Sequence, residues 1–440
     1  MSKFRDQHLQ INWHELAGND DNTPVLGATL EEKSALVGRV GLMMLSVGTA
    51  AWRVRASMNK IARGLGITCT ADIGLLAIAY TCEGDGQLCT NALSLRTTGV
   101  NTHKLRYLEY FADSFGDRAD KYSAGQFHQI LDNIDRLKGN YSRLVLGFAS
   151  AFACCAFTFL LGGGPVEMIC AFFGAGVGNF VRKGLLERKI TLLANVFLGV
   201  ASACITYAAL IRLAEAVLGV SALHQAGYIC SMLFIIPGFP LITGGLDLAK
   251  LDLRSGLERI SYALLIIVTA AVTGWVTASV FSLAPGEFAD LELSLPLQLT
   301  FRLIASFVGV FGFSMMFNST PKNALTAGLI GMAANLTRLE LIDFAGLHPA
   351  VAAFLGTLTA GLLASALKPL FGFPRITVTV PAIVIMVPGM YLYKGVYFLA
   401  RNELGEGGSW LARALLIIIA LPMGLIAARI ITDRNFRKST

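Results

Sequence analysis

The chain has 440 residues, of which 54% are hydrophobic and 15% are charged, and its mean hydropathy is +0.61. Charged residues make up about a quarter of an ordinary soluble domain. This composition therefore excludes a soluble globular protein, and also a fibrous, disordered or disulfide-stapled chain. Residues 1–143 hold 31 of the 65 charged residues. We expect a soluble module followed by a large domain that lies in the lipid bilayer.

The net charge of +7 falls almost entirely in the membrane part, in short connections between apolar runs. Nucleic-acid binding would need that charge on one soluble face, so we expect no nucleic-acid partner. The eight cysteines form no CxxC pair, which favours neither a zinc site nor secreted disulfides. Walker glycines and HExxH are absent, and the first 30 residues lack the apolar core of a signal peptide. We therefore expect no metal, no cofactor and no ATP hydrolysis within this chain.

Residues 1–143 read as a cytoplasmic α+β module, in which residues 1–30 form a flexible tail. The apolar run 35–51 contains Arg39, and its three-to-four residue period continues to Leu65, which predicts one amphipathic soluble helix rather than a membrane span. Two apolar stretches within 75–96 meet at Glu83-Gly84-Asp85-Gly86, which predicts a strand pair. Further helices are expected at about 101–115 and 123–138.

The membrane domain contains ten candidate spans. A bilayer core needs about 20 apolar residues per helix. The runs that approach this length are 144–161, 166–181, 190–211, 227–246, 260–283, 297–317, 324–339, 349–367, 377–399 and 411–431.

The basic residues of the connections predict the orientation, because cytoplasmic loops retain Lys and Arg. With the amino-terminal module inside, the inner connections hold 14 Lys and Arg and the outer connections hold 2. We therefore expect both termini, including the tail 432–440, in the cytoplasm.

An internal repeat divides the membrane domain. Residues 237–267 align with 388–418 at an offset of 151, with 13 identities in 31 positions. At an offset of 156 the polar and proline positions of the first copy recur in the second: Pro165, Asn179 and Arg182 align with Pro321, Asn335 and Arg338. We interpret residues 144–283 and 297–431 as two five-helix halves. An odd number of spans per half makes the repeat inverted, as in many secondary transporters.

The repeat places Pro-Gly steps inside two spans. Pro237 with Gly238, and Pro388 with Gly389, interrupt the fourth and ninth runs. Paired broken helices indicate a central cavity where half-helix ends face a solute, although packing kinks are the alternative. We expect Thr243, Tyr391 and Tyr393 nearby as neutral hydrogen-bond partners for that solute.

Asp247 is acidic where the second copy has Phe398. It lies ten residues beyond Pro237, about 15 Å along a helix, toward the cytoplasmic end of its span. An acidic residue at the edge of lipid is often functional, so it could hold the ammonium of a substrate or take a proton in exchange. The alternative is a solvated carboxylate paired with Lys250 or Arg254.

Four segments resemble the threonine/serine exporter family: VGTAAWRVRASMNKIARGLGI (47–67), IIPGFPLITGGLDL (235–248), FNSTPKNALTAGLIGMAANLTR (317–338) and VTVPAIVIMVPGMYLY (378–393). The resemblance covers residues 35–431 and implies a cytoplasmic module followed by two five-span halves. It also implies export of threonine and serine, and in some members of other small carboxylates, across the bacterial cytoplasmic membrane. The chain departs from the family pattern at Arg55, where a glutamate is usual.

The function expected from the sequence is secondary transport that exports small polar amino acids, driven by the proton-motive force, without enzymatic activity. Export of dicarboxylates or peptides is the alternative within transport. A membrane-anchored hydrolase would use Thr49, Cys82, His103, His128 or Asp132, although no spacing links them. A homo-oligomer is left open.

Overall fold

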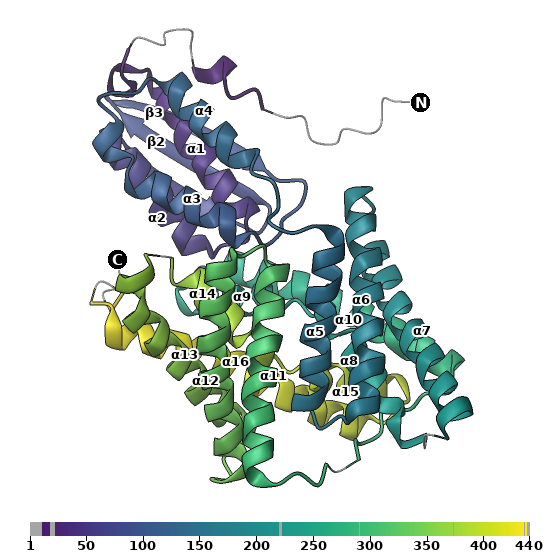
Figure 1. The fold of residues 1–440 in the computed structure, drawn as a ribbon. Coiled ribbons are helices and arrows are strands. Elements are labelled where there is room, and N and C mark those ends of the chain that lie inside the picture. The colour runs from purple at the N-terminus through teal and green to yellow at the C-terminus, as the bar shows by residue number, and fades with distance from the viewer. Residues whose placement is uncertain are drawn as a thin grey trace, which may run out of the picture. The chain divides into compact units, whose positions relative to one another are not determined.

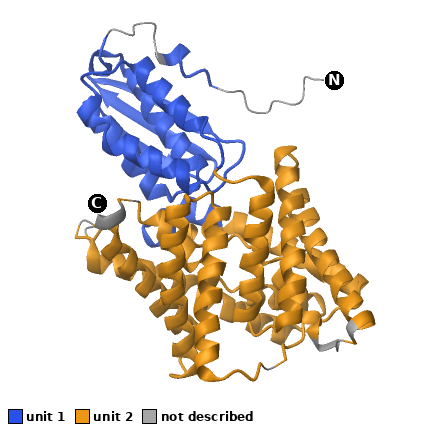
Figure 2. Ribbon diagram, viewed as in Figure 1, with its two compact units in different colours: residues 1–139, 246–259 blue, residues 140–245, 260–440 orange. Residues whose placement is uncertain are grey.

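The computed structural model describes residues 11–17, 23–219, 222–289, 291–372, 374–434 and 436–437. The chain separates into two compact units (Figures 1 and 2). Unit 1 comprises Met1–Gly139 with Leu246–Arg259, and unit 2 comprises Asn140–Gly245 with Ile260–Thr440. The segment 246–259, which the sequence assigns to the first membrane half, therefore groups with the amino-terminal part. Of the predicted tail 1–30, residues 1–10 and 18–22 lie outside the described residues, and α1 begins at Leu30.

Unit 1 combines helices with one antiparallel sheet. Its elements are α1 (Leu30–Ser46), α2 (Ala51–Gly64), β1 (Thr68–Ile73), β2 (Ala77–Gly84), β3 (Gln87–Ser94), α3 (Thr102–Asp113) and α4 (Ala124–Asp135), with 3-10 turns at Glu15–Ala17, Val25–Gly27 and Gly116–Arg118. The strand order is β1-β2-β3. Thr29 and Glu32 form a capping box that starts α1, and Gly38 lets α1 approach Tyr80 of β2, whose hydroxyl donates to the carbonyl of Ser34.

The predicted strand pair is confirmed as the β2–β3 hairpin. Asp85 and Gly86 have φ of 52° and 74°, the two positive values that a type I′ turn requires. Strand β1 was missed, because TCTADI alternates polar and small residues and contains little apolar signal.

The prediction of one helix over residues 35–65 is wrong, because α1 and α2 are separate helices. Gly48 between them has a φ of +84°, and a Cβ there would lie 2.5 Å from the carbonyl oxygen of Gly99. The N–H groups of Gly99 and Asn101 donate to the carbonyls of Ser46 and Val47. The break therefore comes from tertiary contacts that the apolar period does not show.

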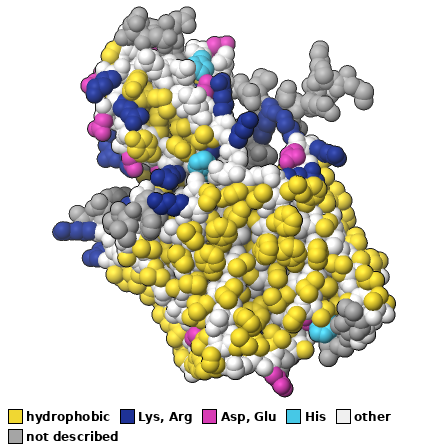
Figure 3. Space-filling view, viewed as in Figure 1, with side chains coloured by type: hydrophobic (Ala, Val, Ile, Leu, Met, Phe, Trp, Pro, Cys, Tyr) yellow, Lys and Arg dark blue, Asp and Glu magenta, His cyan; other side chains and the backbone are white. Residues whose placement is uncertain are grey.

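Unit 2 is α-helical (Figure 1). Its elements are α5 (Arg143–Leu160), α6 (Pro165–Glu187), α7 (Leu192–Leu218), η4 (Ala222–Gly227), α8 (Tyr228–Ser231), η5 (Leu233–Ile235), α9 (Gly238–Ala249), α10 (Leu253–Val280), α11 (Leu295–Met316), α12 (Pro321–Asp343), α13 (Pro349–Phe371), α14 (Ile376–Ile383), η6 (Val384–Met386), α15 (Gly389–Ala400) and α16 (Leu404–Thr432), with α9 ending and α10 beginning in unit 1. Large hydrophobic side chains such as Phe148, Phe152 and Phe173 are exposed, and such side chains cover the visible face of this unit (Figure 3). A surface of this kind suits lipid.

The described chain has seven helices long and apolar enough to cross a membrane, or nine if each of two bent pairs is one span. The protein is thus a multi-pass membrane protein. The predicted run 166–181 lies in α6, which has 23 residues but is not among these helices. Glu167, Asn179 and Arg182 lower its hydropathy.

Element bounds recur between the halves of unit 2. Helices α6 and α12 both begin at a proline and have 23 residues, at the offset of 156. The 3-10 turns η5 and η6, and the 12-residue helices α9 and α15, recur at the offset of 151.

Candidate functional site

Both bent spans have the same backbone geometry at their Pro-Gly step. His224–Ile235 meets α9 at 58°, and Ile376–Met386 meets α15 at 47°. The N–H of Gly238 donates to the carbonyl of Ile236, and that of Gly389 to Val387, both at 2.8 Å. Such a bond across a proline is an inverse γ-turn, and the φ of −79° and ψ of 57° at Pro388 match it. The predicted breaks are therefore present at Pro237 and at Pro388.

The two breaks pack against each other. A Cβ added at Gly238 would lie 2.4 Å from Cγ2 of Val384, immediately before the second break. A Cβ added at Gly389 would lie 2.8 Å from Cδ2 of Leu233, immediately before the first break. Each glycine thus lets the opposite broken span come close, and the structure brings the four Pro-Gly residues together.

The polar side chains predicted near the breaks have different environments. The hydroxyl of Tyr393 lies 2.6 Å from that of Tyr228, so this pair joins the two broken spans in a fully buried position. The hydroxyl of Thr243 donates to the carbonyl of Phe239 in its own helix, at 3.0 Å. Tyr391 instead packs against Trp410 of α16, with ring centroids 5.2 Å apart.

A cavity of about 390 Å³ reaches the first turn of α15. Its volume is in the range of small-molecule sites. Met390 and Lys394, one turn apart on α15, line it together with Arg302 of α11 and the exposed Glu287. Arg302 is paired with Glu340 and Asp343 of α12, at 2.9 and 2.5 Å. A helix amino end and a nearby cation both attract anions.

Lys394 is the cation in this cavity that is not paired with a carboxylate, whereas Arg302 is paired with two. Among the described residues it has no hydrogen bond or ion pair, and its ammonium lies 4.8 Å from the Trp410 ring centroid. Ionisable side chains inside membrane spans are rare and usually functional. The sequence analysis missed Lys394, although the repeat gives a signal, because Lys394 aligns with the neutral Thr243.

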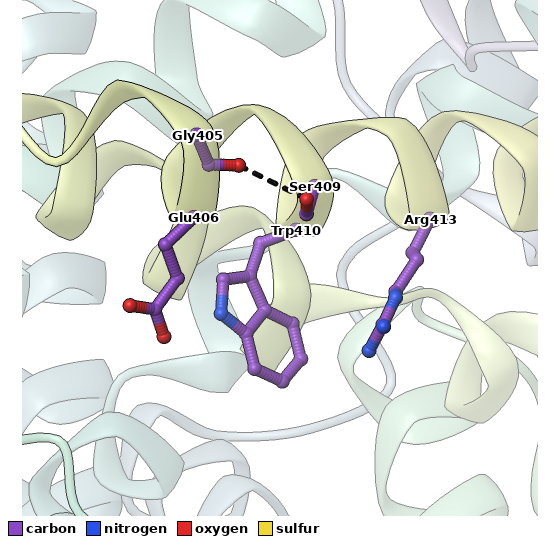
Figure 4. A pocket seen from close by; sticks show the side chains of 5 residues that line it. All are labelled: Gly405, Glu406, Ser409, Trp410 and Arg413. Atoms are coloured by element: carbon purple, nitrogen blue, oxygen red, sulfur yellow. Dashed lines mark hydrogen bonds between the residues drawn. The ribbon is translucent and has the colours of Figure 1, made fainter.

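A second cavity of about 280 Å³ lies along the start of α16 and is lined by Trp410. Glu406 and Arg413 flank the Trp410 ring, and Ser409 donates to the carbonyl of Gly405 at 2.9 Å (Figure 4). The guanidinium of Arg413 lies 5.5 Å from the ring centroid. Opposite charges around an aromatic ring suit a small zwitterion.

The four repeat-related polar residues join neighbouring helices. Asn179 of α6 donates to the carbonyl of Leu146 in α5, and Asn335 of α12 donates to Ser306 in α11, both at 2.8 Å. Arg182 lies against Gly199 of α7, and Arg338 lies against Gly356 of α13. These contacts give the four residues a packing role, while their equivalence by an internal repeat stays a prediction.

Asp247 is part of a buried cluster within unit 1. Its carboxylate accepts from the N–H of Ala51 at 2.9 Å, from Ser255 at 2.9 Å and from Arg259 Nε at 3.0 Å. Arg259 also donates to the carbonyl of Thr49, at 2.8 Å. The alternative of a solvated carboxylate paired with Lys250 or Arg254 is wrong, because Asp247 is fully buried against Arg259. Arg254 pairs with Asp72 and Glu258 instead.

The candidate hydrolase residues do not form a nucleophile–base pair in the described part of unit 1. Nδ1 of His128 lies 3.0 Å from Arg39, and burial, followed by this positive charge, lowers the pKa of His128 to about 3. Asp132 pairs with His14 and Arg39. Thr49 and Cys82 are fully buried elsewhere, so no nucleophile is placed for this histidine.

The fold and the site together define a multi-pass membrane protein with two bent helix pairs that pack against each other. Residues 35–282 match a family model described as "Putative threonine/serine exporter", and residues 302–431 match one described as "Threonine/Serine exporter, ThrE". The chain belongs to the threonine/serine exporter family.

The chain is also similar to distant relatives, of which two are named as transporters and one as a membrane protein. The chain is 24% identical to "Probable threonine/serine exporter" of Mycobacterium tuberculosis, over 88% of this chain and 74% of the relative. It is 24% identical to "Probable succinate transporter subunit YjjP" of Escherichia coli, over 53% of this chain and 88% of the relative. "Pheromone-regulated membrane protein 10" of Pichia sorbitophila is also 24% identical, over 61% of this chain and 27% of the relative. No solved structure matches.

Proposed function

We propose that this protein is a secondary transporter that exports threonine or serine across the bacterial cytoplasmic membrane, driven by the proton-motive force. Family membership and the similarity to the Mycobacterium tuberculosis relative support the substrate class. The main structural support for transport is the pair of broken spans, in which the glycine of each break packs against a side chain of the other span. A cavity lined by charged side chains lies at the first turn of α15.

The proposed topology has ten spans, with α6 as the tenth, arranged as two inverted five-span halves. The recurring element bounds and the matching turns at the two Pro-Gly steps support the repeat. The basic inner connections support a cytoplasmic location of both termini and of unit 1.

In this proposal the cavity binds a zwitterion through opposite charges. The substrate carboxylate lies between the amino end of α15 and Lys394, where the helix dipole and the ammonium both favour an anion. The exposed carboxylate of Glu287 attracts the substrate ammonium. Movement of the broken spans about their γ-turns then exposes the substrate to the other side.

A small dicarboxylate is the second candidate substrate. Lys394 and Arg302 line the same cavity, and a relative in Escherichia coli is named as a succinate transporter subunit. Arg302 is already paired with two carboxylates, which leaves one cation for the substrate. This pairing favours the substrate with a single carboxylate.

Counterflow in vesicles reconstituted with the full chain tests the proposal. Labelled threonine, serine, succinate and a dipeptide are offered to vesicles preloaded with the same unlabelled compound. We expect exchange of threonine or serine, and a higher KM in Lys394→Gln, because the substrate carboxylate loses its cation. Lys368→Gln, at an exposed lysine near the end of α13, is the matched control. Exchange of succinate alone would make the protein a dicarboxylate transporter. Hydrolysis of the dipeptide without exchange of any compound would favour the alternative of a membrane-anchored hydrolase.

A further inference from the structure

Glu167 is a fully buried acid in the membrane unit that the proposed substrate site does not use. It is the third residue of α6, and the residue as a whole is 0% exposed. Its Oε1 lies 2.6 Å from Nδ1 of His224 in η4. Its Oε2 is buried without a hydrogen-bond partner among the described residues. Burying a carboxylate oxygen without a hydrogen bond costs free energy. Ionisable groups that bear this cost inside a membrane unit usually serve a function.

His224 connects this acid to the surface of unit 2. Its side chain is 22% exposed, against 1% for Glu167. Tyr207 of α7 donates to the carbonyl of His224 at 2.6 Å, which fixes the backbone of η4. A histidine in this position can exchange protons with water and pass them along its hydrogen bond to the carboxylate.

The other titratable groups around the pair are weak acids or lie in pairs of their own. Cys170 of α6, Tyr207 of α7 and Cys230 of α8 interact electrostatically with Glu167. Arg212 and Glu215 of α7 pair with each other at 2.7 Å. Arg143 of α5 bonds the carbonyl of Phe180, toward the other end of α6. Among the described residues, His224 is the hydrogen-bond partner of the Glu167 carboxylate, at 2.6 Å.

The second half shows that this helix position does not need a charge. At the offset of 156, Glu167 aligns with Asn323, which is also the third residue of a 23-residue helix beginning at proline. Asn323 is 1% exposed and cannot titrate. The carboxylate is therefore specific to the first half, in which η4 leads directly into the broken span.

We infer that Glu167 and His224 are the proton-carrying pair of this transporter. His224 accepts an excess proton of the aqueous phase at Nε2 and releases the Nδ1 proton to Oε1 of Glu167, so that His224 stays neutral and the Glu167 carboxylate becomes a neutral acid. The hydrogen bond then loses its negatively charged acceptor, and η4 is held less tightly at α6. Because η4 begins the span that breaks at Pro237, proton uptake favours movement of that span. This inference rests on the proposed proton-driven transport.

The test separates proton coupling from translocation in reconstituted vesicles of the full chain. Glu167→Gln keeps the shape but cannot titrate. We expect it to retain counterflow and lose transport driven by a pH gradient. Glu187→Gln, at the exposed end of the same helix, is the control and should keep both activities. Gradient-driven transport at the wild-type rate in Glu167→Gln would overturn the inference.

A second variant decides the question if Glu167→Gln does not insert or fold. His224→Gln changes a partly exposed side chain and removes proton exchange with water. It should slow gradient-driven transport and preserve counterflow, and a wild-type response to the gradient would overturn the inference. Failure of the proposed function has a different signature, since the wild-type protein would then exchange none of the tested solutes. A wild-type protein that exchanges solute without responding to the pH gradient would overturn the inference and leave the transport function in place.

Discussion

The ion pair between Asp247 and Arg259 ties the loop before α2 to the corner between α9 and α10. Asp247 accepts the first N–H of α2, so it also occupies the position where a negative charge stabilises a helix. Arg259 binds the loop carbonyl of Thr49 on the other side. Each end of the pair thus bonds residues 49–51, and the pair explains why 246–259 groups with unit 1.

We expect Asp247→Asn to lower the stability of unit 1 by about 3 kcal/mol, because it leaves Arg259 buried without its counter-ion. The remaining amide oxygen can still accept one hydrogen bond, which keeps the loss at the low end. Thermal unfolding of the purified full chain and protease cleavage at residues 47–51 measure it.

The matched control for Asp247 is Arg254→Gln, which removes a partly exposed arginine from two surface ion pairs. Such pairs contribute about 0–1 kcal/mol, so this variant should unfold like the wild type. An unchanged transition in Asp247→Asn would contradict the structural role. If that variant also lost gradient-driven transport, the coupling role predicted from the sequence would be supported.

The residues of the candidate site were only partly predictable from the sequence. Pro237 and Pro388 were found because their effect on a helix is local and the repeat marks them. Lys394 and Glu167 were missed, since their significance depends on which helices surround them. One signal was available for both, because each is charged where the other half has a neutral residue, Thr243 or Asn323.

At the scale of elements, the two breaks pack closely against each other. We therefore expect that larger side chains at Gly238 and Gly389 are poorly tolerated. In Gly238→Ala the new Cβ meets Val384, and overpacking of this kind costs about 1–3 kcal/mol. We expect counterflow to fall in this variant and to be abolished in Gly238→Leu and Gly389→Leu, with the protein still inserted in the membrane. Initial rates in vesicles, normalised to inserted protein, measure the loss.

Two further variants show whether the packing itself is responsible. Gly408→Leu introduces a side chain into open space on α16 and should leave transport unchanged. Val384→Ala should restore part of the activity of Gly238→Ala, because it removes the atoms that the new Cβ meets. Full activity in both leucine variants would reduce the Pro-Gly steps to packing kinks.

Elements whose formation depends on neighbouring residues in the sequence were predicted well from the sequence. Elements that depend on tertiary contacts were not. The hairpin at Asp85-Gly86 follows from turn chemistry, which acts within four residues. The interruption at 47–50 depends on Gly99 and on Asp247, which lie far away in the sequence. An apolar period alone therefore predicted a single helix there.

At the scale of the whole molecule, aligned positions of the two proposed halves carry different charges. The scaffold recurs in α6 and α12 and in α9 and α15, whereas Glu167, Lys394 and Asp247 have no charged counterpart at the aligned position. In an inverted repeat the shared scaffold would supply two equivalent conformations. The unmatched charges would then give each half a separate task, with proton uptake in the first and substrate binding in the second.

The orientation of these halves is testable by thiol labelling of intact cells. None of the eight native cysteines is exposed in the described structure, so the wild-type chain should give a low background. Glu287 is exposed in a connection that we propose lies outside, so Glu287→Cys should react with a membrane-impermeant reagent. Arg188→Cys, in the basic connection after α6, should react only after the cells are permeabilised, because basic connections stay in the cytoplasm. Gly407 is less suitable as an outer position, since a side chain there meets Leu399. Labelling of Arg188→Cys in intact cells would place unit 1 and both termini outside and would overturn the proposed orientation.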